Sequence, residues 1–277
     1  MLTFQNYIDG AEAKSASTET TPVVDPATGQ AYGSAPKSNA ADVDKAMEAA
    51  AKAFESWKET TPSERQVLLL KIADELDTRK EELAEAECKN CGKPKKLFLE
   101  EEMVPIVDQI RFFAGACRNL EGKAGGVFMK GLMSIIVREP VGVCAAVTPW
   151  NYPIMMAVWK WAPSLAAGNT MVLKPSDTTP ASTLLMAKIM GDILPPGVFN
   201  VVCGEKDTGA LLAGHATPAF ISITGSVRAG KEVAAASAPS LKRVHLELGG
   251  KAPVVVFSDA DLPAAAEAIA LAAFFNA

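Results

Sequence analysis

Polar residues that directly follow apolar runs are the first candidates for chemistry in this sequence. An apolar run at 141–147 leads to Asn151, and a second run at 170–173 leads to Lys174. A neutral amide such as that of Asn151 can donate a hydrogen bond to a developing oxyanion, and a lysine at the end of a strand can contact nucleotide ribose hydroxyls. Each has a plainer alternative, because Asn151 could cap a helix that begins at Pro153 and Lys174 could lie in a solvated turn.

Two further groups have the same two explanations, functional and structural. Thr224, Gly225 and Ser226 join an apolar run to a helix, and the free N–H groups of a helix start suit a pyrophosphate. No GxGxxG fingerprint is present, and ordinary helix capping is the commoner reason for such residues. Glu247 precedes Gly249-Gly250. In a partly dry cleft a carboxylate gains the pKa range of a general base, whereas a solvated strand face is the commoner surrounding.

These residues need a scaffold that brings the ends of several strands together. Residues 153–167 are apolar enough for a buried helix, which ends near Gly168-Asn169. Residues 141–174 therefore form a strand–helix–strand unit, and its two polar tips share one end of a parallel sheet. Strands and helices continue to alternate towards the C-terminus. The pattern predicts an α/β fold with a doubly wound parallel sheet.

The remaining elements follow from periodicity and turn signals. Residues 1–37 indicate short strands that lie on the main body, and residues 133–138 a strand of a protruding ribbon. Pro105 is expected to kink or split its helix. Helices are expected at 39–58, 61–76, 80–90, 95–120, 180–193, 207–214, 226–237 and 262–275, and further strands at 199–202, 219–223, 244–248 and 254–257.

The composition excludes several classes of partner. The 277 residues carry a net charge of −5 and a pI near 5.3, which argues against a nucleic-acid or anionic-membrane partner. No signal peptide and no apolar stretch long enough for a membrane span is apparent, so a cytoplasmic location is expected. Cys88 and Cys91 form a CxxC without a second pair. This favours ordinary helix cysteines over a metal or redox site, and no metal is expected.

Taken in order, four motifs resemble those of the NAD(P)-dependent aldehyde dehydrogenase family, and the resemblance covers essentially the whole chain. The motifs are Thr148-Pro149-Trp150-Asn151-Tyr152-Pro153, Lys174-Pro175-Ser176, Thr224-Gly225-Ser226 and Glu247-Leu248-Gly249-Gly250-Lys251. Within the family, the runs 111–115 and 195–202 look most similar to the aminoaldehyde group, such as gamma-aminobutyraldehyde and betaine aldehyde dehydrogenases.

The resemblance implies a role for each matching residue. Asn151 would be the oxyanion donor, Glu247 the general base, and Lys160 part of a charge relay, although a lysine stem packed in the core is an equal alternative for Lys160. The cofactor would be NAD rather than NADP, on the strength of Asp177 alone. Implied cofactor contacts are Thr148, Pro149, Trp150, Lys174, Pro175, Ser176, Asp177, Gly209, Thr224, Gly225, Ser226 and Leu248; implied substrate contacts are Tyr152, Met156 and Trp159.

The largest departure from the family concerns the nucleophile. In the family mechanism a cysteine thiolate attacks the aldehyde, hydride passes to the nicotinamide, and water hydrolyses the thioester. The family's cysteine comes a few residues beyond a segment like 274–277, so the matching position is expected past residue 277, and none of the five cysteines present stands there. We therefore expect an NAD-binding domain at 1–250, with an oligomerisation ribbon at 121–139, and the start of a truncated catalytic domain at 251–277.

Two functions follow from this reading. The first is oxidation of a small-molecule aldehyde, preferably an aminoaldehyde, by a homo-oligomer that is dimeric or tetrameric at full length. On that reading the 277 residues by themselves are expected to be inactive and to expose apolar surface. The alternative is a dinucleotide-binding or subunit-interaction module without catalysis.

Overall fold

The computed structural model describes residues 1–276, except for the side chain of Ala124. Its centre is a seven-stranded sheet with the strand order β12-β11-β8-β9-β10-β2-β3. The first five strands in this order are mutually parallel, and β2 and β3 complete one edge as antiparallel strands. The predicted doubly wound parallel sheet is confirmed. The strands are β2 (Asn6–Ile8), β3 (Ala11–Ala13), β8 (Val143–Val147), β9 (Thr170–Lys174), β10 (Phe199–Val201), β11 (Phe220–Gly225) and β12 (Arg243–Leu248).

The strand order reverses beside β8. From β8 the chain proceeds to β9 and β10 on one side, and then returns to β11 and β12 on the other. In the register, Val147 lies opposite both Lys174 of β9 and Ile223 of β11. Such a reversal opens a crevice beyond the carboxyl ends of the strands, where open α/β sheets bind their ligands.

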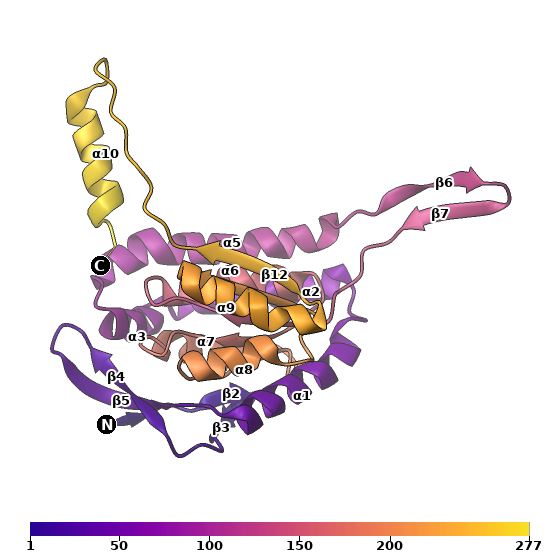
Figure 1. Ribbon diagram of the computed structural model, residues 1–277, viewed down its shortest axis with the longest axis horizontal. Helices are drawn as coiled ribbons and strands as arrows, with labels where there is room; N and C mark the ends of the chain where they lie inside the picture. The colour runs from indigo at the N-terminus through magenta and orange to yellow at the C-terminus, as the bar shows by residue number, and fades with distance from the viewer. Residues whose placement is uncertain (277) are drawn as a thin grey trace.

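Helices cover both faces of the sheet (Figure 1). α6 and α7 pack on β9 and β10, with α2, α3 and α5 outside them, whereas α1, α8 and α9 pack on the opposite face. The apolar core between these layers includes the fully buried Trp57 and Trp161. The helices are α1 (Ala40–Trp57), α2 (Pro62–Thr78), α3 (Lys80–Cys91), α5 (Met103–Ala116), α6 (Pro153–Ala166), α7 (Ala181–Gly191), α8 (Lys206–Gly214) and α9 (Val227–Ser237).

The helix expected at 95–120 is interrupted, but not at Pro105 itself. It begins as α4 (Lys95–Leu97), passes through a π-helical turn at Phe98–Glu102, and continues as α5, followed by a 3₁₀ turn at Cys117–Asn119. Pro105 is the third residue of α5, and it offers no N–H to the carbonyl four residues before it, that of Glu101, which lies in the π-helical turn. The irregularity therefore precedes the proline, and it carries Glu102 at its end.

Two small sheets lie outside the main sheet. The N-terminal strands β1 (Leu2–Thr3), β4 (Thr20–Asp25) and β5 (Gln30–Pro36) form one of them. The other is the ribbon of β6 (Lys123–Met129) and β7 (Leu132–Ile136), which projects away from the body (Figure 1). Its apolar side chains are largely exposed, with Val127 at 69% and Phe128 at 83%. Within the described residues, no helix has both the length and the apolar character that crossing a membrane requires.

The C-terminal part corrects one expectation. Residues 254–257 do not form a strand, although the structure describes them; they lie in an extended segment with Val254 65% and Phe257 73% exposed. A strand needs a ladder partner, and the described chain offers none there. Beyond it α10 (Leu262–Phe274) stands apart from the sheet (Figure 1), and none of its residues is buried. The apolar exposure expected of this segment is present.

Candidate functional site

A cavity of 890 Å³ lies at the strand reversal. Its walls come from the carboxyl ends of β8, β9, β11 and β12 and from one side each of α8 and α9. The motifs that stood far apart in the sequence meet here. Of the residues predicted from the sequence, the cavity is lined by Thr148, Pro149, Trp150, Asn151, Lys174, Ser176, Asp177, Gly209, Thr224, Gly225, Ser226, Glu247 and Leu248.

The turn after β8 forms one wall. Thr148 is buried, and its N–H donates to the carbonyl of Lys174 over 3.1 Å, so the two strand tips are joined. Trp150 is 57% exposed at the mouth. The cap of α6 is Tyr152, without a side-chain hydrogen bond, and Pro153 occupies the first turn. Asn151 therefore does not cap this helix, and the simpler of its two explanations is wrong.

Lys174 supports the floor of the cavity. It is 5% exposed, and its Nζ donates to the carbonyls of Pro175 over 2.8 Å and of Gly204 over 2.5 Å. Burial lowers the pKa of Lys174, with Asp177 opposing the shift. These two bonds leave one of the three ammonium donors for a ligand. Lys174 is thus not the solvated turn residue of the plainer explanation.

Two helix starts face the cavity. Ser226 caps α9 by accepting a hydrogen bond from the N–H of Ala229 over 3.2 Å, and α8 begins directly after Glu205. Opposite α9, Leu248 packs so closely that a Cβ on Gly230 would lie 2.5 Å from one of its methyl groups. The paired N-termini provide backbone donors and a positive potential that favour an anionic group.

Glu247 lies on the opposite wall in a more open setting. Its side chain is 61% exposed and its Oε1 lies 3.1 Å from Nε2 of His245. Nδ1 of His245 in turn lies 2.9 Å from the hydroxyl of Ser222. The glutamate is thus on a solvated strand face, not in a dry cleft, although it does line the cavity.

Lys160 is separated from this cavity and lines a second one of 430 Å³ together with Trp159 and His245. It is 8% exposed, and burial lowers its pKa while Glu247 raises it. Pro175, Tyr152, Met156 and Trp159 do not line the first cavity. The structure thus brings the predicted cofactor residues together, apart from Pro175, but leaves the predicted substrate residues outside.

Several lining residues escaped the sequence analysis. Glu205 follows β10 and pairs with Lys37 over 3.0 Å, and Lys206 pairs with Glu232 over 3.2 Å. The Lys37 ammonium holds the pKa of Glu205 below its usual value. The strand-end rule that selected Lys174 would also have found Glu205 and Lys206. Arg228 and Glu232 line the cavity too, and only their spacing on one face of α9 could have indicated this.

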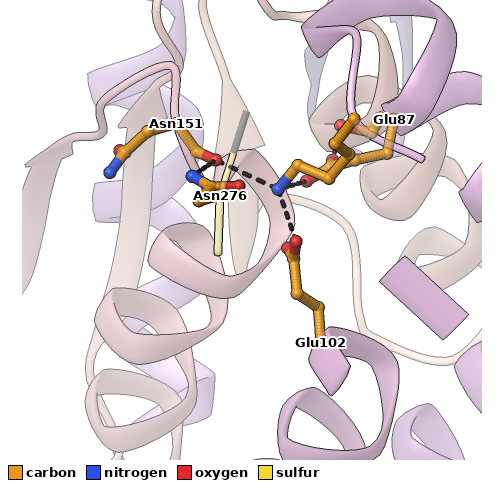
Figure 2. Close-up of polar contacts among 6 residues, drawn as sticks. Glu87, Glu102, Asn151 and Asn276 are labelled. Carbon is orange, nitrogen blue, oxygen red and sulfur yellow. Dashed lines mark hydrogen bonds and ion pairs between the residues drawn. The ribbon is translucent and has the colours of Figure 1, made fainter. Parts of the chain in front are cut away.

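Beneath Asn151 lies a buried cluster of charges (Figure 2). Nζ of Lys93 lies 2.6 Å from Oε1 of Glu102, 4.0 Å from Oε1 of Glu87 and 3.0 Å from the carbonyl oxygen of Asn151. That carbonyl also accepts a hydrogen bond of 3.0 Å from Nδ2 of Asn276. The side-chain amide of Asn151 points away from the cluster (Figure 2). The residue thus has an anchored backbone and an outward amide.

Comparison with known proteins gives one family and several solved structures that are similar to this chain. The model of the aldehyde dehydrogenase family matches residues 13–277. PnpE in complex with nicotinamide adenine dinucleotide is similar, with a TM-score of 0.94 and 40% identity over 98% of this chain and 56% of that one. Aldehyde dehydrogenase C from Pseudomonas syringae, a variant in complex with NAD⁺ and octanal, gives 0.93 and 40% over 98% and 55%.

Betaine aldehyde dehydrogenase from Staphylococcus aureus in complex with NAD⁺ is also similar, with a TM-score of 0.92 and 33% identity over 96% of this chain and 55% of that one. The present chain therefore spans little more than half the length of the solved structures that it matches.

Proposed function

The chain belongs to the aldehyde dehydrogenase family, and we propose that it binds NAD in the 890 Å³ cavity and that the whole protein oxidises an aldehyde to a carboxylic acid. The observation that carries the proposal is the meeting of four strand ends and two helix N-termini around one cavity at the reversal of strand order. Three of the similar structures are complexes with this dinucleotide.

The residues of the cavity suit the parts of a dinucleotide. The N-termini of α8 and α9 offer donors to the pyrophosphate, and the free donor of Lys174 and the carboxylate of Asp177 suit ribose hydroxyls. A carboxylate there also disfavours the 2′-phosphate of NADP. When bound, NAD supplies the acceptor for a hydride.

The chain's own residues have separate tasks in the proposed reaction. The outward amide of Asn151 donates a hydrogen bond to the oxygen of the aldehyde carbon, where negative charge develops. The carboxylate of Glu247 accepts a proton from the water that releases the acid. Lys160, which lines the second cavity and whose charged form the Glu247 carboxylate favours, takes part in a charge relay. We propose the division into an NAD-binding domain at 1–250 and a catalytic segment from 251 on the same basis.

Titration of the chain with NAD tests the cofactor proposal. Binding is detected by calorimetry and by quenching of the Trp150 fluorescence. We expect saturable binding to the wild type and its loss in Gly225→Glu, which places a carboxylate near the pyrophosphate. Arg111→Ala, which removes an exposed pair with Asp74 far from the cavity, should bind as the wild type does. A folded wild-type chain that binds no NAD at millimolar concentration would contradict the proposal.

We further propose that the substrate is an aminoaldehyde. The support is the sequence likeness at 111–115 and 195–202 together with the 33% identity to a betaine aldehyde dehydrogenase. In the whole protein, kcat/KM for betaine aldehyde and 4-aminobutyraldehyde should exceed that for octanal. A preference for octanal, which occupies one similar structure, would overturn the aminoaldehyde proposal but not the family reaction.

A second candidate function is dinucleotide binding without catalysis. In the described chain all five cysteines are free, and burial raises the pKa of each of their thiols, to about 11 for Cys144 and about 12 for Cys203. Such thiols are protonated and poor nucleophiles at neutral pH. Residues 1–277 by themselves should therefore bind NAD and oxidise no aldehyde, and thiol-dependent turnover above a heat-killed control would disprove this.

The ribbon of β6 and β7 suggests that the whole protein is a homo-oligomer. Its exposed apolar side chains, among them Phe128 and Met133, form a surface of the kind that subunit contacts cover. Light scattering of the wild type and of Phe128→Asp/Met133→Asp tests this proposal. A monomer in both cases would count against it.

A further inference from the structure

The carbonyl of Asn151 lies just before α6 and is bonded by two side chains. In an α-helix the cap residue's carbonyl accepts the first helical hydrogen bond, and here Tyr152 accepts it from the N–H of Met156 over 2.9 Å. The carbonyl of Asn151 precedes this ladder and receives no backbone donor in the described chain. It is satisfied by Lys93 and Asn276, each at 3.0 Å. A side chain distant in sequence thus fixes the backbone of the residue proposed to donate to the oxyanion.

Lys93 is held from several directions. It follows Gly92, whose positive φ of 81° ends α3, and it is 3% exposed. Its ammonium contacts Glu102 at 2.6 Å and lies 4.5 Å from the centroid of the Tyr152 ring. The π-helical turn places Glu102, and α3 contributes Glu87 (Figure 2). Ser182 of α7 donates a hydrogen bond to Glu87. The π-helical turn, α3 and the turn before α6 therefore meet at one ammonium group, through Glu102, Glu87 and the Asn151 carbonyl.

Such a cluster is costly to bury. It contains two carboxylates and one ammonium, and each buried ion loses several kcal/mol of hydration before pairing compensates. An apolar cluster of similar volume would often be at least as stable. The charges thus add little to stability that apolar packing could not, but they provide a directed donor to the Asn151 carbonyl, which apolar side chains cannot.

We propose that Lys93 is a positioning residue: through the carbonyl of Asn151 it fixes the turn of residues 148–152, so that the Asn151 amide and the Trp150 ring face the cavity. The catalytic meaning of this role rests on the proposed function. The mechanical part does not, because the conformation of the turn can be measured without NAD or aldehyde.

α6 provides a matched control at its other end. Nε of Arg65 donates to the carbonyl of Ala166 over 2.9 Å, and Arg65 is 6% exposed. Arg65 and Lys93 are both buried cations that bond a carbonyl at an end of α6. Arg65, however, is remote from the cavity lining.

Lys93→Met alone leaves two buried carboxylates without their cation, so the test uses Lys93→Met/Glu102→Gln, in which the nearer of the two is neutral. Glu102→Gln serves as its background and Arg65→Met as the control. Amide hydrogen exchange is read along α6. We expect exchange at residues 150–156 to rise about ten-fold in the double variant relative to Glu102→Gln, and Arg65→Met to raise exchange only near residue 166. Unchanged exchange at 150–156, or equal acceleration along all of α6, would overturn the proposal.

Two functional readouts separate this inference from the proposed function. The double variant should bind NAD about five-fold more weakly than the wild type, whereas Arg65→Met should bind NAD with the wild-type affinity. The thermal midpoint of the double variant should be no lower than that of Arg65→Met. In the whole protein the double variant should lower kcat about ten-fold and leave the KM for the aldehyde unchanged. Added to Asn151→Ala, the same two substitutions should lower kcat no further. A further loss in the Asn151→Ala background would contradict positioning through Asn151. If the wild type neither binds NAD nor oxidises aldehydes, the proposed function fails, and the exchange comparison still decides the role of Lys93.

Discussion

The two walls that carry the proposed catalytic residues are built in opposite ways. Asn151 stands on a buried cluster in which Lys93, Glu87 and Glu102 are each 3% exposed or less. Glu247 stands near the end of β12 with its side chain 61% exposed, and its Oε1 lies 3.1 Å from Nε2 of His245, whose side chain is 51% exposed. A dense packing of three elements surrounds the first residue, and solvent surrounds the second.

The difference shows where this part of the protein is pre-organised. A hydrogen-bond donor to an oxyanion is effective only if its direction is fixed before the charge develops, and the described residues provide this for Asn151. A general base needs a controlled environment for its proton, and the described residues provide little of this for Glu247. We therefore expect substitutions beneath Asn151 to have large effects on folding and those around Glu247 to have small ones.

The largest expected effect is that of Lys93→Met alone. Removing one partner of a buried ion pair costs about 3–5 kcal/mol, because the remaining charges are left uncompensated. Urea denaturation should therefore show a loss of this size in the free energy of unfolding. Lys80→Met, which removes an exposed pair with Asp77 at 3.1 Å, should cost at most about 0.5 kcal/mol. Equal losses in the two variants would show that burial of the Lys93 cluster adds nothing to the cost of removing a cation.

Because of Glu87, we expect the unfolding free energy to depend on pH. Burial raises its pKa from 4.5 to about 7, so the folded protein disfavours the ionised form. This cost in unfolding free energy is absent below pH 4.5, grows as the pH rises towards 7, and is complete above 7. It amounts to about 3 kcal/mol. Relative to Glu87→Gln, the wild type should lose this much unfolding free energy between pH 4.5 and 8, whereas parallel curves for the two proteins would refute the assignment.

Gly230→Ala tests the wall on the side of Glu247. The added Cβ would lie 2.5 Å from a Leu248 methyl group, and overpacking of this kind costs about 1–3 kcal/mol in a rigid surrounding. Because Leu248 is 36% exposed, it can move aside, and we expect a cost near 1 kcal/mol together with weaker NAD binding. Gly214→Ala, whose Cβ would have open space, should be neutral or slightly stabilising. A cost above 3 kcal/mol at Gly230 would mean that this wall is rigid.

His245→Ala is expected to have the smallest effect. The pair with Glu247 is exposed on both sides, and pairs of this kind contribute at most about 1 kcal/mol. Thermal unfolding should therefore shift only slightly. A loss above about 2 kcal/mol would show that the wall of Glu247 is fixed after all.

Much of the scaffold could be predicted from the sequence, because it depends on local signals. The strand–helix–strand unit around Asn151 and the start of α2, where Thr61 and Glu64 form a capping box, follow from periodicity and capping residues. The strand expected at 254–257 was wrong, because strand formation depends on a partner that an apolar run does not reveal.

The site itself was only partly predictable. The strand-end rule located Asn151, Lys174 and Glu247, since it follows from topology. The cluster of Lys93, Glu87 and Glu102 could not be foreseen, because charged residues in an amphipathic helical stretch ordinarily face solvent. Only the tertiary packing of α3, the π-helical turn and α7 turns these three side chains inward.

The π-helical turn at Phe98–Glu102 determines which direction each side chain of α5 faces. Successive residues of an α-helix are about 100° apart around the axis, and a π turn inserts roughly one extra residue into that count. The apolar stripe of α5, which includes Ile106 and Ile110, is thereby rotated against the helix start at Lys95. Glu102 and the apolar stripe therefore keep a fixed orientation relative to each other. A gain or loss of one residue before Glu102 would rotate both away from their packing partners.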